Sequence, residues 1–189
     1  YCLLHRRKLQ EIIKICSDEK LPYFILGNGS NLLVSDAGYR GVIIQLYRNY
    51  GEITAEGNMI RAKAGALLSQ IAAAAKNASL TGFEFAGGIP GTLGGAVVMN
   101  AGAYGGEMKD ILKEVTVMTE KGEILTLPAE ELEMGYRTSI IKKKGYLVLG
   151  AVIVLEQGEQ EVIKAKNERA DRAESKQTTF RVSERRKYV

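Results

Sequence analysis

The chain has 189 residues, 46% of them hydrophobic and 25% charged, which is close to the average for globular proteins and enough for a sizeable core. Its net charge of +4 and its pI near 9.0 suit an anionic small molecule, whereas nucleic-acid-binding proteins usually carry a denser basic stripe. Two cysteines and one histidine argue against a disulfide framework, a histidine-ligated metal site and a histidine-based catalytic triad. No apolar run approaches the roughly 18 residues that span a bilayer. We therefore expect a cytoplasmic protein with no metal, no nucleic-acid partner and no membrane insertion.

Apolar spacing in the first part of the chain predicts one helix and several short strands. Residues 6–20 have apolar side chains at helical intervals. Short apolar runs bounded by turn-forming residues then predict strands over residues 21–27, 32–36 and 41–46.

The second part of the chain continues this mixture of elements. Residues 58–65 read as a strand, and the alanine-rich residues 66–79 read as a strong helix. After a glycine-rich stretch, residues 114–127 have the pattern of a β-hairpin around Lys121 and Gly122. Three predicted elements remain, a short helix, a long strand and a charged helix: residues 128–134, 145–157 and 159–176. This order favours an α+β or mixed α/β fold over a regular βαβ alternation.

Residues 27–31, Gly-Asn-Gly-Ser-Asn, form the first glycine-rich segment and directly follow a short apolar run. Successive backbone N–H groups in such a turn can converge on an anion, and Ser30 and Asn31 add side-chain donors. The residues that follow look extended, so this is not a Rossmann fingerprint, which needs a helix there. The segment is either an anion-binding turn or a plain turn between two strands.

Residues 87–106 form the second glycine-rich segment, with glycine at eight of its twenty positions. Glycine within a regular element costs roughly 0.5–1 kcal/mol relative to alanine, so this concentration needs a compensating reason. A backbone without Cβ atoms can lie flat against a ligand, with Thr92 and Asn100 supplying polar contacts. A crowded crossing of chain segments is the structural alternative. An extended dinucleotide with a pyrophosphate would engage both glycine-rich segments.

Three stretches carry a resemblance to a known enzyme family: LGNGSNLLVSDAGYRGVII from residue 26, GFEFAGGIPGTLGGAVVMNAGAYGGEM from residue 82, and GYRTS from residue 135. In this order they resemble the UDP-N-acetylenolpyruvoylglucosamine reductases, also called UDP-N-acetylmuramate dehydrogenases, over roughly residues 8–177. The resemblance implies an α+β chain with the vanillyl-alcohol-oxidase (PCMH) type of FAD-binding fold, in which FAD lies between two α+β subdomains. It also implies a cytoplasmic flavoprotein oxidoreductase of peptidoglycan synthesis.

The same resemblance implies that both glycine-rich segments cradle FAD. His5 lies in neither segment, so we expect FAD to be held non-covalently rather than through a histidine. The cofactor-binding residues that the resemblance implies are Gly27, Asn28, Gly29, Ser30, Asn31, Leu32, Gly88, Ile89, Pro90, Gly91, Gly94, Gly95, Met99, Asn100, Ala101, Gly102 and Ala103.

Tyr136 and Arg137 match the active-site motif of the family. Taken alone, Arg137 is better interpreted as a solvated charge or a carboxylate partner than as a catalytic residue, and Tyr136 fits a core position as well as a substrate pocket. The resemblance implies that Arg137 is catalytic and that Tyr136 helps to bind the substrate. In the implied cycle, NADPH reduces FAD, and a UDP-sugar enolpyruvyl ether then accepts the hydride. A fixed guanidinium can stabilise the charge that develops on the carboxylate side, because it does not lose its own proton.

The resemblance also divides the chain. Residues 1–50 are expected to be a shortened first FAD-binding subdomain, 51–157 the second subdomain, 158–177 a connecting helix and 178–189 an atypical basic tail. The family's C-terminal substrate domain, which donates the proton to the substrate, is expected to be absent, so the chain alone should lack that step. Two alternatives stay open: a non-catalytic flavin-binding module, and another flavin oxidase of the same fold. No obligate protein partner is evident.

Overall fold

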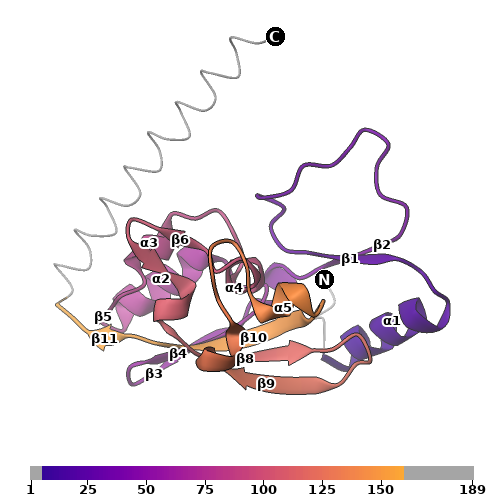
Figure 1. The fold of residues 1–189 in the computed structure, drawn as a ribbon. Coiled ribbons are helices and arrows are strands. Elements are labelled where there is room, and N and C mark those ends of the chain that lie inside the picture. The colour runs from indigo at the N-terminus through magenta and orange to yellow at the C-terminus, as the bar shows by residue number, and fades with distance from the viewer. Residues whose placement is uncertain (1–5, 160–189) are drawn as a thin grey trace, which may run out of the picture.

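The first part of the structure, a computed structural model that describes residues 6–159, is a helix and a parallel strand pair (Figure 1). Helix α1 (Arg6–Asp18) is followed by strands β1 (Tyr23–Leu26) and β2 (Val42–Gln45), which pair in parallel. Parallel neighbours need a long crossover connection. Here residues 27–41 provide it without regular secondary structure, and Figure 1 shows this connection projecting from the body of the protein.

Five antiparallel strands form the main sheet, in the order β3-β4-β10-β8-β9. Their bounds are β3 (Ile53–Glu56), β4 (Met59–Lys63), β8 (Leu112–Met118), β9 (Ile124–Pro128) and β10 (Leu147–Val154). The central strand β10 is buried along almost its whole length, as expected for a strand covered on both faces.

Short helices cover one side of this sheet in Figure 1, and α4 contacts β10. The helices are α2 (Leu68–Asn77), α3 (Glu84–Gly87), α4 (Leu93–Val98) and α5 (Ile140–Lys143), with 3-10 turns η1 (Arg48–Tyr50), η2 (Met108–Asp110) and η3 (Ala129–Leu132). Two small antiparallel pairs complete the fold: β5 (Leu80–Thr81) with β11 (Glu156–Gln157), and β6 (Gly102–Ala103) with β7 (Gly106–Glu107).

One hydrophobic cluster connects these parts. It includes Leu9 and Ile13 of α1, Ile44 of β2, and the buried side of the main sheet, so the strand pair and the sheet share a core. Within residues 6–159, none of the helices has both the length and the apolar character needed to cross a membrane.

Several predicted elements are confirmed and others are wrong. The helices over 6–20 and 66–79 and the hairpin over 114–127 are present, whereas residues 32–36 form no strand and Leu33 is 96% exposed. Strand β3 was not predicted, because only its first residue, Ile53, is even half-buried.

The glycine-rich segment is also more regular than the single loop that its composition predicts. Helix α4 lies within it, because Leu93, Ala96 and Val97 are buried at helical spacing and their packing outweighs the cost of glycine. The predicted helix over 159–176 and the tail over 178–189 lie outside the described residues. The subdomain boundary at residue 50 stays a prediction.

Candidate functional site

The two glycine-rich segments meet in the folded chain. The Asn28 side-chain amide (Nδ2) donates a hydrogen bond of 3.0 Å to the Pro90 carbonyl oxygen, across a sequence separation of 62 residues. Beside it, a Cβ added to Gly27 would overlap the Thr92 hydroxyl. The Gly27 carbonyl in turn accepts a 3.2 Å hydrogen bond from the Gln45 side chain of β2. The sequence alone predicted two separate loops, and the structure brings them into direct contact.

Glycines in these segments occur for different physical reasons. A Cβ on Gly94 would lie 3.1 Å from the Ala64 side chain, so crowding explains this glycine, as it explains Gly27. Gly91 has no atom closer than 3.8 Å to such a Cβ, and Gly95 has none within 4 Å. Neither Gly91 nor Gly95 has the left-handed backbone that favours glycine. The crowded-crossing alternative therefore accounts for only part of the set.

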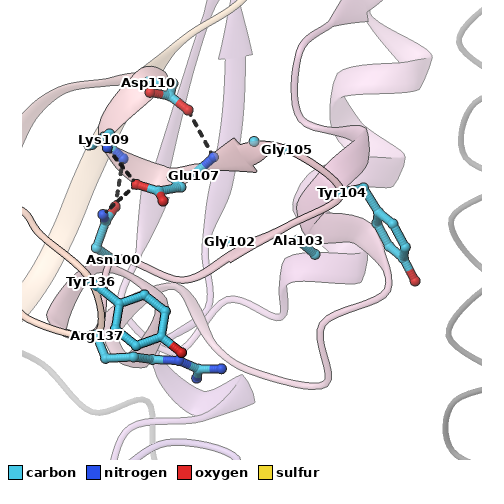
Figure 2. A pocket seen from close by; sticks show the side chains of 11 residues that line it. Asn100, Gly102, Ala103, Tyr104, Gly105, Glu107, Lys109, Asp110, Tyr136 and Arg137 are labelled. Atoms are coloured by element: carbon cyan, nitrogen blue, oxygen red, sulfur yellow. Dashed lines mark hydrogen bonds and ion pairs between the residues drawn. The ribbon is translucent and has the colours of Figure 1, made fainter.

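A pocket of about 440 Å³ opens at the C-terminal end of the second glycine-rich segment (Figure 2). Its lining comes from that segment, from η2 and from the turn over residues 135–138. The lining residues are Asn100, Gly102, Ala103, Tyr104, Gly105, Gly106, Glu107, Lys109, Asp110, Tyr136 and Arg137. Five residues predicted from the sequence are thus brought together, whereas residues 27–32, 88–95, Met99 and Ala101 lie outside this pocket.

Tyr136 and Arg137 occupy the tip of a tight turn. Gly135 and Thr138 close it with two reciprocal backbone hydrogen bonds of 3.1 and 3.3 Å. Arg137 has the left-handed backbone conformation, with φ of 57°, and its side chain lies beside that of Tyr136 in Figure 2, where both line the pocket. Tyr136 is 88% exposed, so its interpretation as a core residue is wrong. Arg137 forms no ion pair with any residue in the range 6–159, which leaves its guanidinium available to an anion.

Asn100 is the polar centre of the opposite wall. Its side chain is buried and donates to a Glu107 carboxylate oxygen at 2.9 Å and to the Gly135 carbonyl at 3.2 Å. The side-chain oxygen Oδ1 of Asn100 accepts a hydrogen bond of 3.0 Å from the Lys109 backbone N–H. The sequence predicted Asn100 as a ligand contact, but the structure uses its side chain for internal bonds.

Lys109 and Glu107 neutralise each other through an ion pair of 2.7 Å. Hydrogen bonds from Lys109 and Asn100 hold the pKa of the Glu107 carboxyl below its ordinary value, and Glu107 raises the pKa of Lys109. Of the two cations that line the pocket, Arg137 is therefore the one without a carboxylate among the described residues. Sequence reasoning missed Tyr104, Glu107, Lys109 and Asp110; the first two lie within the GAYGGEM stretch and could have been found there.

The pairing of Glu107 predicts a pH dependence of stability. Folding lowers the pKa of the Glu107 carboxyl. The ionised carboxylate therefore contributes fully to the free energy of unfolding above its unfolded-state pKa of about 4.3, and this contribution is lost as the pH falls through the folded-state pKa. We expect the parent protein to unfold at a higher temperature than the Glu107→Gln variant near neutral pH, with the difference narrowing in acid. Thermal unfolding of both proteins across this pH range is the measurement. A difference in unfolding temperature that stays the same at every pH would contradict a stabilising role of the ionised Glu107 carboxylate.

Comparisons with known proteins identify the family to which the chain belongs. A family model described as "FAD binding domain" matches residues 4–128. The chain is 51% identical over 173 residues to UDP-N-acetylenolpyruvoylglucosamine reductase of Clostridium botulinum, covering 91% of this chain and 57% of that protein. It is also 51% identical over 158 residues to the enzyme of the same name from Alkaliphilus metalliredigens, covering 84% of this chain and 52% of that protein. The chain thus spans a little over half the length of these curated relatives.

Two solved structures show where the fold belongs. The UDP-N-acetylenolpyruvylglucosamine reductase of Thermus caldophilus matches with a TM-score of 0.78 and 35% identity, covering 92% of this chain and 61% of that one. The 6-hydroxy-D-nicotine oxidase of Arthrobacter nicotinovorans matches with a TM-score of 0.60 and 19% identity, covering 82% of this chain and 35% of that one, which shows the fold alone. The predicted vanillyl-alcohol-oxidase (PCMH) type of FAD-binding fold is confirmed.

Proposed function

Since this chain belongs to the FAD-binding domain family, we propose that it holds FAD non-covalently and serves the NADPH-linked reduction of UDP-N-acetylglucosamine enolpyruvate to UDP-N-acetylmuramate in peptidoglycan synthesis. Its relatives by sequence carry the name of that reductase. The proposal includes a cytoplasmic location, where that substrate would be made.

The observation that carries this proposal is the contact between the two glycine-rich segments through Asn28 and Pro90. An extended dinucleotide needs a surface that continues from one segment to the other, and this contact supplies it. At Gly91, next to Pro90, no protein atom lies closer than 3.8 Å to where a Cβ would stand, so a ligand has room to approach the chain there, although the Gly91 N–H and carbonyl already bond to Ile89 and Leu68. The residues present therefore fit FAD.

The residues that would hold FAD fall into two groups. The first surrounds the contact between the segments and is suited to the pyrophosphate: Gly27, Asn28, Gly29, Ser30, Asn31, Leu32, Gly88, Ile89, Pro90, Gly91, Gly94 and Gly95. The second continues toward the pocket: Met99, Asn100, Ala101, Gly102 and Ala103.

Arg137 is the residue that we propose to act on the substrate. FAD, when bound, supplies the redox chemistry that amino-acid side chains lack. The Arg137 guanidinium offers paired hydrogen-bond donors to the substrate carboxylate. Such a fixed cation stabilises negative charge that develops on a carboxylate during reaction. Tyr136, exposed beside it in Figure 2, would contact the substrate at the mouth of the pocket.

Absorption spectroscopy tests the proposal directly. We expect the purified chain, after addition of FAD and removal of unbound cofactor, to retain the visible flavin band and to lose it when NADPH is added without oxygen. A band that NADPH leaves unchanged would favour a non-catalytic flavin-binding module. Turnover of an alcohol or hydroxy acid with oxygen would favour an oxidase of the same fold. No retained flavin, even from excess FAD, would overturn FAD binding by this chain.

A further inference from the structure

The hydroxyl of Ser139 forms an unusual contact. Ser139 is fully buried and directly precedes α5, where a serine ordinarily accepts a hydrogen bond from the first turn of its own helix. Here it makes no such cap. Its Oγ instead donates a 2.8 Å hydrogen bond to the Val98 carbonyl, 41 residues away. Val98 ends α4, and the last carbonyls of a helix have no partner within it, so Ser139 satisfies one of them.

Asn100 makes the matching contact on the other side of the same turn. Its side chain donates to the Gly135 carbonyl at 3.2 Å, while Ser139 follows the turn at Thr138. The turn that carries Arg137 is therefore attached at both ends to one short segment, residues 98–100. Residues 98–100 lie within the second glycine-rich segment.

The two hydrogen bonds from Asn100 and Ser139 hold the Arg137 turn in its observed backbone conformation. Arg137 holds a left-handed backbone conformation, which is unfavourable for a residue with a side chain, so a free turn would relax away from it. We propose that Asn100 and Ser139 are positioning residues that fix the Arg137 turn against the glycine-rich segment. The attachment itself is a property of the chain, and its consequence for the reaction rests on the proposed function.

Limited proteolysis measures the attachment without any cofactor. Arg137 is exposed, so trypsin can cut after it once the turn opens, and the rate of cutting reports the population of the open turn. We expect the Ser139→Ala variant to be cut after Arg137 about fivefold faster than the parent protein, as loss of one hydrogen bond predicts. The Asn100→Asp variant keeps an acceptor for the Lys109 N–H but loses the bonds to Gly135 and Glu107 and places two carboxylates in contact, so it should show a larger increase.

The β8–β9 turn supplies a matched control within the same molecule. Lys121 is exposed there, and the Thr119 hydroxyl accepts a 3.2 Å hydrogen bond from the Glu123 N–H. We expect Thr119→Val to speed cutting after Lys121 and to leave cutting after Arg137 unchanged. Unaltered cutting after Arg137 in both site variants would overturn the proposal. An equal increase after Arg137 and Lys121 in Ser139→Ala would also overturn it, because that would indicate general loosening.

A second readout uses the flavin-loaded protein. Ser139→Ala should slow oxidation of the reduced protein by UDP-N-acetylglucosamine enolpyruvate about fivefold and leave its reduction by NADPH unchanged. Equal slowing of both halves would overturn a role specific to Arg137. If the parent protein retains no flavin, the proposed function fails, while the proteolysis ratios still decide the attachment.

Discussion

Replacing Gly91 by alanine is expected to raise the Kd for FAD about tenfold, which corresponds to about 1.4 kcal/mol of lost contact between the ligand and this stretch of the chain. A Cβ at this position would meet no protein atom closer than 3.8 Å, so the apoprotein should keep its unfolding midpoint. The added methyl group would instead stand between the backbone and the ligand. Titration of FAD, followed by flavin fluorescence, and thermal unfolding of the apoprotein measure the two effects separately.

Gly94→Ala is the matched control for this variant. Its Cβ would lie 3.1 Å from the Ala64 side chain and 3.3 Å from the Ala64 carbonyl oxygen, so it should destabilise the fold itself, by about 1–3 kcal/mol for an overpacked site. Because Gly94 also belongs to the proposed FAD-binding group, the comparison rests on the unfolding midpoint, which only Gly94→Ala should lower. An unchanged Kd in Gly91→Ala would show that FAD does not approach this part of the backbone.

Replacing Gly27 by alanine is expected to lower the free energy of unfolding by about 1–3 kcal/mol and to weaken FAD binding as well. The new Cβ would overlap the Thr92 hydroxyl, and Thr92 is buried, so the two glycine-rich segments must move apart. Both segments contribute to the proposed site, and their separation should therefore affect the ligand and the fold together. Denaturant unfolding and FAD titration of the variant are the measurements.

The Thr92→Ala variant tests whether the overlap with the Thr92 hydroxyl causes these effects. Thr92 makes no side-chain cap for α4, so removal of its hydroxyl should cost little, and its Cβ is 3.5 Å from the modified position, an ordinary contact. We expect the double variant Gly27→Ala/Thr92→Ala to regain most of the lost stability. Effects that simply add in this double-mutant cycle would contradict a direct clash between the two positions.

Local patterns were sufficient to predict much of the fold. The buried stripe of Leu9, Ile13 and Cys16 follows helical spacing, and Gly122 marks the β8–β9 turn, so both elements could be read from neighbouring residues alone. Residues 32–36 have an apolar sequence of the same kind, but no neighbouring strand pairs with them in the described part of the chain. A strand needs a partner, and partners are set by tertiary structure rather than by local composition.

In the candidate site too, some features could be predicted from the local sequence and others depend on tertiary structure. The glycine-rich segments and the Tyr136–Arg137 pair are visible in the sequence, but the sequence cannot distinguish Gly91 from Gly94, whose difference lies in what a side chain would touch. The bond from Asn100 to Gly135 spans 35 residues and leaves no local signal. The left-handed conformation of Arg137 was equally hidden, because glycine or asparagine ordinarily marks such a position.

Tyr104, on the pocket wall, shows what this backbone geometry means for engineering the protein. It too has a left-handed backbone, with φ of 53°, and it is 54% exposed, so packing gains little from its ring. A residue held in this way costs of order 1–3 kcal/mol, and Arg137 faces the same penalty. Glycine at either position would make the protein more robust to heat while deleting a side chain from the pocket. Selection for thermal stability alone would therefore favour the loss of these two pocket side chains. Stability and activity make opposite demands on the two turns that carry Tyr104 and Arg137.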